Sequence, residues 1–182
     1  MARGLIYAAR HPRPALSARI CLGRTDVPPA ESAEAGAEAL LARLSLPDWE
    51  PLARIVSSPL RRAREVAQAL ARLTGARLHA DDRLTDTEFA AWEGRAWTAI
   101  PRAELDAWAA DPLGYRPGGG ESLQQVLDRV RRAWTGLASS ADATLVVTHA
   151  APIRCLLHVA QSVPLPGTDI GFGAVVRVRS AP

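Results

Sequence analysis

The chain has 182 residues, of which 22 are arginine, none is lysine and 19 are acidic, so its formal net charge is only +3. Its hydrophobic content of 48% and charged content of 23% are typical of a globular protein with one core. The arginines are dispersed, and no run of about 18 apolar residues occurs, which argues against nucleic-acid binding and against a membrane span. We therefore expect one cytoplasmic domain over residues 1–182, with Cys21 and Cys155 as small core residues rather than a disulfide.

The first predicted element is a short apolar run, residues 4–8, which indicates a buried strand. Arg10 and His11 follow at its end, and Pro12 and Pro14 then forbid a helix. Cations at the end of a buried strand cost desolvation energy unless an anion meets them. This stretch therefore indicates an anion-binding site.

Helices and short strands alternate along the rest of the chain. Residues 111–120 are rich in proline and glycine and are predicted to form a loop. Alternating β and α elements are typical of an α/β sandwich around a mostly parallel sheet. The pattern predicts helices over 31–44, 60–73, 101–110, 121–137 and, following residue 150, to about 159, and extended segments over 52–56, 77–79, 83–89, 143–150 and 173–180.

Polar clusters follow three of the predicted strands. They are Arg10-His11, Ser57-Ser58 with the nearby Arg61-Arg62, and Thr148-His149. Because the carboxyl ends of parallel strands meet at one edge of a sheet, we expect two histidines and an arginine to converge there. Helix N-termini offer free N–H groups to anions, and the arginine fork suits phosphate oxygens. The crevice is predicted to bind a phosphoryl group, with a histidine able to act as nucleophile.

Five motifs stand in the chain in this order: RHP, SSPLRRAREVA, WEG, PGGGES and VVTHAAPIR. Through them the chain resembles the histidine phosphatase (phosphoglycerate mutase-like) superfamily from residue 5 to about residue 157. The segment CLGRTDVP and the compact length are most similar to its alpha-ribazole phosphatase branch. The resemblance implies a three-layer α/β/α sandwich with a mostly parallel central sheet, and a chemistry without metal or cofactor.

The resemblance also implies roles for single residues. His11 matches the histidine that becomes phosphorylated, and His149 matches the second histidine of the pocket, which we expect to be protonated. Arg10 and Arg62 match the arginines that bind phosphate. Further contacts are implied with phosphate for Ser17 and Ala150, and with the rest of the substrate for Arg24, Glu121 and Ser122.

The proton donor departs from the family pattern. Asp86 stands where glutamate is usual, and Glu88 offers a longer side chain two residues later. Since residues two apart in an extended segment point to the same side, both acids are expected to face the crevice, with Thr85 and Thr87 turned away. We favour Asp86, because a shift of two residues moves the acid along the strand by roughly 6.5 Å.

These observations favour a metal-independent phosphomonoesterase that acts on a small phosphorylated metabolite through a phosphohistidine. The resemblance points to alpha-ribazole 5′-phosphate as the substrate. Three alternatives stay open: mutase-type phosphotransfer, dephosphorylation of phosphohistidine on a partner protein, and a phosphate-binding module without catalysis. The last is motivated by the altered acid, by Pro12 after His11, and by Ala150-Ala151 where the family has glycines.

Overall fold

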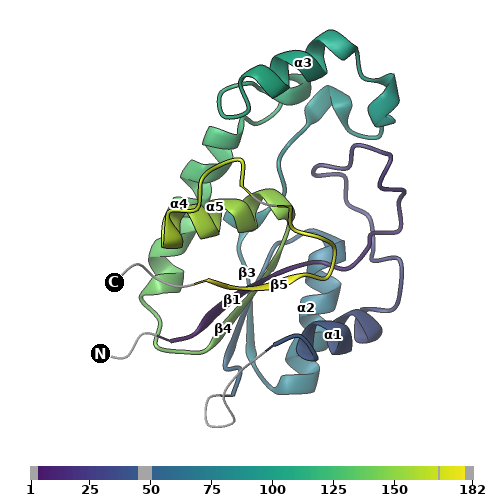
Figure 1. Cartoon of the computed structure of the whole chain (residues 1–182). Helices are drawn as coiled ribbons and strands as arrows, with labels where there is room; N and C mark the ends of the chain where they lie inside the picture. Colours follow the sequence, from purple (N-terminus) through teal and green to yellow (C-terminus); the bar gives the residue numbers. More distant parts are fainter. Residues whose placement is uncertain (1–3, 45–50, 168, 179–182) are drawn as a thin grey trace.

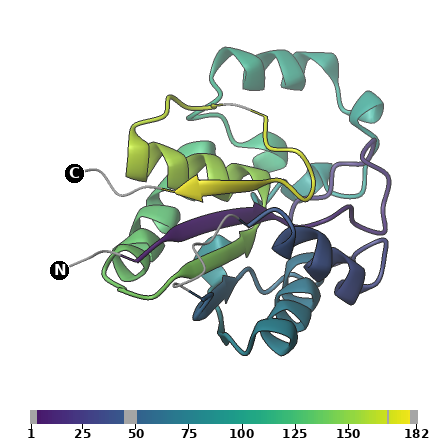
Figure 2. The ribbon, with the colours of Figure 1, turned by 60° about the horizontal axis from the view of Figure 1, so that its bottom comes forward.

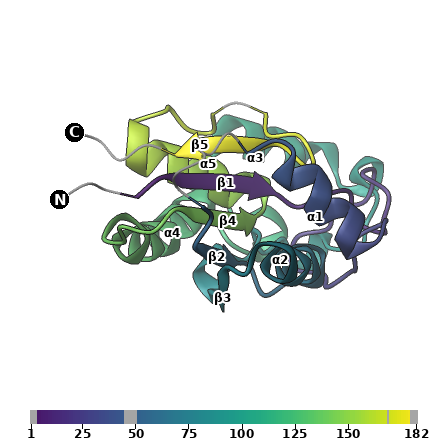
Figure 3. The ribbon, with the colours of Figure 1, turned by 90° about the horizontal axis from the view of Figure 1, so that it is seen from below.

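A computed structural model describes residues 4–44, 51–167 and 169–178 of the chain. The described residues form a five-stranded sheet in the order β3-β2-β4-β1-β5, which Figure 3 shows side by side. The last strand pairs antiparallel with β1 and the other neighbours pair in parallel, so the sheet is mostly parallel. The strands are β1 (Ile6–Arg10), β2 (Arg54–Ser57), β3 (Arg77–Ala80), β4 (Thr144–Thr148) and β5 (Val175–Val178).

Helices cover both faces of this sheet. The pair α1 (Ala33–Leu41) and α2 (Arg61–Thr74) lies on one face, and the pair α4 (Leu123–Ala138) and α5 (Ala150–Gln161) lies on the other (Figures 1 and 3). This arrangement confirms the predicted three-layer α/β/α sandwich. None of the helices in the described part of the chain is long and apolar enough to cross a membrane.

Side chains that alternate along the strands feed two separate cores. On β1, Tyr7 packs into the core beneath α1 and α2, whereas Ile6 packs into the core beneath α4 and α5. The same alternation places Leu145 and Val146 of β4 in different cores. All four residues are 5% exposed or less, so the central strands are buried on both faces. This double burial explains why the sequence shows continuous apolar runs there.

A lobe formed between β3 and α4 covers the carboxyl ends of the strands. It contains α3 (Arg102–Ala110), which lies at the top of Figure 1, apart from the sheet. Trp92 is 1% exposed at its centre, and its indole Nε1 donates to Glu104 Oε2 over 2.7 Å. Figure 2 shows the same lobe, in teal, above the edge strand β5, the yellow arrow. Short 3₁₀ turns complete it at Ala90–Trp92, Trp97–Ala99 and Pro117–Gly119.

Most predicted elements begin and end within three residues of those observed. The last two residues of the strand predicted over 173–180 lie outside the described part of the chain. The extended segment predicted over residues 83–89 is wrong at its start, because a 3₁₀ turn occupies Asp82–Leu84, where the Asp81 side chain accepts from Arg83 N over 3.0 Å. Thr85 has an extended backbone, but residues 85–89 form no strand. A short polar side chain such as that of Asp81 can bind a nearby backbone N–H group, and this local hydrogen bond competes with extended structure.

Candidate active site

Three neighbouring strands bring the predicted polar clusters together. The register of β1 on β4 places Arg10 opposite Thr148, so the next residues, His11 and His149, are adjacent, with ring centroids 5.0 Å apart. On the other side of β4, Ser58 follows β2 and places its Oγ 2.8 Å from His149 Nε2. The parallel register alone therefore assembles the centre of the site.

His11 is 2% exposed and its hydrogen bonds define one tautomer. Its Nδ1 lies 2.6 Å from the carbonyl oxygen of Pro12, which can only accept, so the proton is assigned to Nδ1. The lone pair is then on Nε2, to which Arg62 Nε donates over 3.3 Å. Burial, with the nearby His149 and the Arg62 charge, lowers the pKa of His11 well below its usual value. A neutral imidazole whose Nε2 lone pair is released from Arg62 as a phosphoryl group arrives is a competent nucleophile.

Arg62 is the arginine of its cluster that enters the site. It is fully buried in the first turn of α2, and its Nη2 donates to Gly23 O over 2.6 Å and to Asp86 Oδ2 over 3.2 Å. In contrast, Arg61 is half-exposed and pairs with Glu65 on the same helix over 2.7 Å. The structure therefore places Arg62, the residue to which the resemblance assigns phosphate binding, inside the site and Arg61 outside it.

Asp86 and Glu88 do not face the same crevice, so this prediction is wrong. The Asp86 carboxylate is 20% exposed, and its Oδ2 lies 3.5 Å from His149 Nδ1. Glu88 is 48% exposed and pairs instead with Arg24, 3.4 Å away. Thr87 is 6% exposed and lines the pocket rather than turning away from it. The physical reason is the turns on either side, which remove the strict two-residue alternation that the prediction assumed.

We expected His149 to be protonated, but its surroundings favour the neutral form. It is fully buried, and burial together with the charges of Arg62, Arg10 and Arg129 lowers its pKa well below the usual value. Its Nδ1 has no hydrogen-bond partner among the described residues and faces the carboxylate of Asp86. A proton on Nδ1 is favoured by that carboxylate, in which case the Ser58 hydroxyl donates to Nε2. An N–H group held in this way suits a phosphate oxygen.

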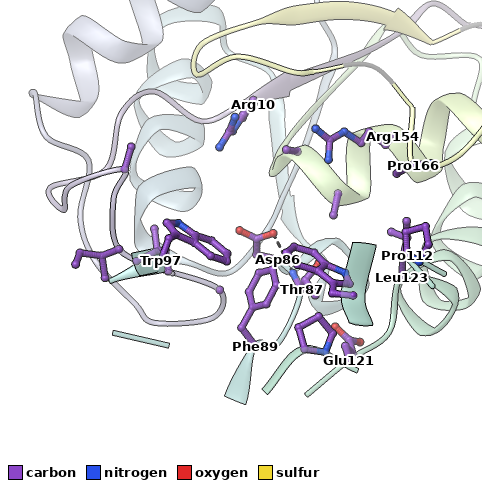
Figure 4. A pocket seen from close by; sticks show the side chains of 18 of the residues that line it. Arg10, Asp86, Thr87, Phe89, Trp97, Pro112, Glu121, Leu123, Arg154 and Pro166 are labelled. Atoms are coloured by element: carbon purple, nitrogen blue, oxygen red, sulfur yellow. Dashed lines mark hydrogen bonds between the residues drawn. The ribbon is translucent and has the colours of Figure 1, made fainter. Parts of the chain in front are cut away.

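A pocket of about 480 Å³ opens in front of Arg10, His11 and Asp86, whereas the fully buried Arg62 and His149 lie behind its lining. Figure 4 shows Arg10 and Arg154 on one side of the cavity, with Trp97 and Phe89 on the other and Asp86 between them. The Arg10 guanidinium carbon lies over the Phe172 ring, 3.8 Å from its centroid, and Arg10 Nη1 donates to Ile170 O. The predicted site residues that line this pocket are Arg10, His11, Ser17, Asp86, Glu121 and Ala150.

The remaining predicted substrate contacts lie elsewhere. Ser122 is 5% exposed and caps α4 in a capping box with Gln125, so its hydroxyl is used by the helix. Arg24 does not line the pocket and instead pairs with Glu88 and, over 3.1 Å, with Glu121. Glu121 reaches the pocket wall, but its carboxylate is engaged by arginines. The polar groups of these residues are therefore bound within the protein, where they stabilise the wall of the site instead of contacting a ligand.

Arg129 is a component of the site that sequence reasoning missed. It is 7% exposed on α4 and binds Glu121 through two bonds of 2.9 and 3.1 Å. Its other N–H groups donate to Arg83 O over 2.7 Å and to Asp86 O over 3.0 Å. Arg129 therefore fixes the position of the Asp86 backbone by hydrogen bonding to its carbonyl oxygen. A charged residue on the inner, apolar face of a predicted helix was the available signal.

The glycines of PGGGES have a packing role beside the same segment. A Cβ on Gly118 would lie 2.1 Å from Phe89 O, and one on Gly120 would lie 2.0 Å from Glu88 O. Glu121 N then donates to Glu88 O over 2.8 Å. The absent side chains let this loop approach the backbone that follows Asp86. Within the described residues, no group of three or more His, Cys, Asp or Glu side chains could hold a metal ion.

Comparison with known proteins identifies relatives over most of the chain. The family model described as "histidine phosphatase superfamily (branch 1)" matches residues 6–172. A bifunctional protein of Mycobacterium tuberculosis is 35% identical over 133 residues, which cover 70% of this chain but 34% of that protein. The chain thus spans about a third of the length of that relative.

Other relatives match over more of their own length. A glucosyl-3-phosphoglycerate phosphatase of Mycolicibacterium vanbaalenii is 34% identical over 166 residues, covering 83% of this chain and 70% of the relative. A probable phosphoglycerate mutase of Photorhabdus laumondii is 26% identical over 166 residues, covering 87% of this chain and 75% of the relative.

The solved structure of a mycobacterial glucosyl-3-phosphoglycerate phosphatase superposes with a TM-score of 0.73 at 28% identity, covering 96% of this chain and 89% of that one. These comparisons confirm the predicted superfamily. The relatives include both phosphatases and a probable mutase, and they do not single out the predicted alpha-ribazole branch. By the extent of the family match, the chain belongs to the histidine phosphatase superfamily, branch 1.

Proposed function

We propose that this chain is a phosphoric monoester hydrolase that works through a phosphohistidine on His11. The observation that carries the proposal is the hydrogen bonding of His11, which leaves a lone pair on Nε2 in a buried, cationic environment. Its phosphatase-named relatives support the same class of reaction.

The phosphoryl group of the substrate binds among Arg10, Arg62 and His149. The arginines supply positive charge, and the Nδ1–H of His149 donates to one phosphate oxygen. These fixed groups stabilise the charge that develops on the equatorial oxygens in the transition state. A phosphate dianion raises the pKa of His149 as it arrives, which strengthens this contact.

The reaction then proceeds in two displacements. His11 Nε2 attacks phosphorus, the P–N bond forms and the ester P–O bond breaks, while Asp86, which takes up a proton when the substrate binds, gives that proton to the leaving oxygen. Water next attacks the phosphohistidine, Asp86 accepts a proton from that water, and the P–N bond breaks to release inorganic phosphate. The site returns to its starting state, with one ester and one water consumed.

The test is the assay of purified protein with a panel of phosphate monoesters in the presence of a chelator. The panel includes alpha-ribazole 5′-phosphate, which the sequence resemblance suggests. It also includes glucosyl-3-phosphoglycerate, the substrate in the names of several relatives. Rapid quenching with ³²P-labelled substrate should trap an acid-labile, base-stable label on the wild type. His11→Ala should abolish both label and turnover, whereas the exposed His79→Ala should retain both. Turnover by the folded His11→Ala variant would exclude the mechanism.

Mutase-type transfer is the second candidate, favoured by the similarity to a probable phosphoglycerate mutase. It predicts that catalytic amounts of 2,3-bisphosphoglycerate interconvert the phosphoglycerates faster than inorganic phosphate is released. Dephosphorylation of a partner protein is less favoured, because the α3 lobe walls the pocket and limits access by a folded domain.

A further inference from the structure

The pocket beyond the phosphate-binding groups is walled mainly by apolar side chains. Its wall includes Ile20 and Leu22 from the segment after β1. Phe89, Trp97, Leu105 and Trp108 come from the lobe around α3. At about 480 Å³, the cavity has the size of pockets that enclose a ligand of drug-like dimensions. It is larger than a phosphate group alone requires.

The aromatic side chains form one interlocked cluster. Phe89 meets Trp97 and Trp108 edge to face, with centroids 5.9 and 5.8 Å apart, and the two tryptophans lie within 11° of parallel. The cluster packs on the buried Trp92, which is hydrogen-bonded to Glu104. Because each ring is held by the others, this wall is preformed and needs little reorganisation to receive a ligand.

Apart from Arg10, His11 and Asp86, the described lining has four charged or hydroxyl-bearing side chains, Ser17, Thr87, Glu121 and Arg154, and three of these already have partners. Glu121 is taken up by Arg129 and Arg24, and Ser17 Oγ accepts from Arg19 N over 3.2 Å. Arg154 lies 3.7 Å from Asp169. The described lining contains no Asn or Gln, the amide side chains that pair with a hydroxyl as both donor and acceptor. A sugar enclosed here would leave hydroxyls without partners, which is unfavourable.

We infer that the preferred substrate is a phosphate monoester whose alcohol carries a flat aromatic group, rather than a sugar phosphate. This inference rests on the proposed function. The phosphate lies at His11, and the aromatic group lies against Phe89, Trp97 and Trp108. Such a ring buries apolar surface against the cluster and offers few hydroxyls that need partners. The inferred substrate therefore differs from the sugar phosphate in the names of the related glucosyl-3-phosphoglycerate phosphatases.

The test compares esters of primary alcohols, so that the intrinsic reactivity of the leaving group stays similar. We expect 2-(2-naphthyl)ethyl phosphate to have a kcat/KM about tenfold or more above that of glucose 6-phosphate and of ethyl phosphate. Trp108→Ala should lower the ratio of kcat/KM between the naphthyl and ethyl esters, chiefly through KM. Trp134→Phe, in the α4/α5 core away from the pocket, is the matched control and should keep the ratio.

A binding measurement separates this inference from the proposed function. 2-Naphthylmethylphosphonate, which has no ester bond to cleave, should bind the His11→Ala protein and quench its tryptophan fluorescence, and Trp108→Ala should weaken that binding. Binding of the phosphonate without turnover of any ester would overturn the phosphatase but support the aromatic pocket. Hydrolysis of sugar phosphates at least as efficient as that of the naphthyl ester would overturn the aromatic pocket and leave the phosphatase standing.

Discussion

Arg62 donates its Nε–H to Nε2 of His11 over 3.3 Å, although the two residues lie 51 positions apart in the chain. The bond requires a neutral His11 with its lone pair toward the guanidinium. It therefore marks the place at which a phosphorus atom would meet the nucleophile and the cation together. The same guanidinium is fixed by Thr25 O and Gly23 O, so it is already oriented before any ligand binds.

Arg62→Ala should lower kcat/KM far more than Arg64→Ala or Arg61→Ala. Loss of a charge-assisted donor at the transferring phosphoryl group costs about 3 kcal/mol or more, roughly a hundredfold in rate. Arg64 is exposed and Arg61 is bound to Glu65, so their loss should change kcat/KM little. Steady-state assays, with circular dichroism to verify folding, measure the effect. Equal losses in all three variants would mean that the cluster acts only as a diffuse positive surface.

Asp86→Asn should slow hydrolysis of alkyl phosphates much more than hydrolysis of p-nitrophenyl phosphate. Its carboxyl lies 3.5 Å from His149 at the centre of the site and can serve as the acid, while p-nitrophenolate leaves without a proton. Glu88→Gln is the control, because Glu88 is half-exposed and pairs with Arg24. A selective loss in Glu88→Gln, and not in Asp86→Asn, would assign the proton transfer to Glu88.

Arg129→Lys should impair the same proton transfer, because Arg129 positions the backbone of Asp86 without touching substrate. Lysine keeps the charge but cannot bind Glu121, Arg83 O and Asp86 O at once. We expect the alkyl-to-p-nitrophenyl ratio of kcat/KM to fall, as in Asp86→Asn but less strongly. Arg129→Met should also lower the free energy of unfolding by about 3 kcal/mol or more, because it leaves the 14%-exposed Glu121 with one arginine fewer. An unchanged ratio in a folded Arg129→Lys variant would restrict this residue to a structural role.

Stability should fall as the pH drops below about 6.5, the usual pKa of histidine. The pKa values of His11 and His149 are lowered by burial in the folded chain, so below pH 6.5 the unfolded chain binds more protons than the folded one. Between pH 6.5 and the lowered values, each pH unit costs up to about 1.4 kcal/mol for each histidine.

Urea unfolding at pH 7.5 and pH 5.5 measures this difference. His11→Asn should reduce it, and the exposed His79→Gln should not. The same difference in His11→Asn as in the wild type would show that carboxylates dominate the pH response.

The order of helices and strands was predictable from the sequence because it depends on local patterns. Apolar runs such as 144–148 are buried on both faces in the centre of a parallel sheet, and their polar ends converge for the same topological reason. His11, Arg62 and His149 were therefore brought together as predicted, since each sits next to a regular strand or at the start of a helix.

Only the tertiary structure decided the environment of residues 82–92 and of the groups around them. There, Asp86 and Glu88 lie in an irregular segment between two 3₁₀ turns, so periodicity no longer says which of them faces inward. The direction of the Asp86 carboxyl depends on Arg62 and Arg129, which lie 24 and 43 positions away. The sequence alone determined which elements carry the chemistry, whereas long-range hydrogen bonds in an irregular segment determined which acid enters the site and which side chains wall the pocket.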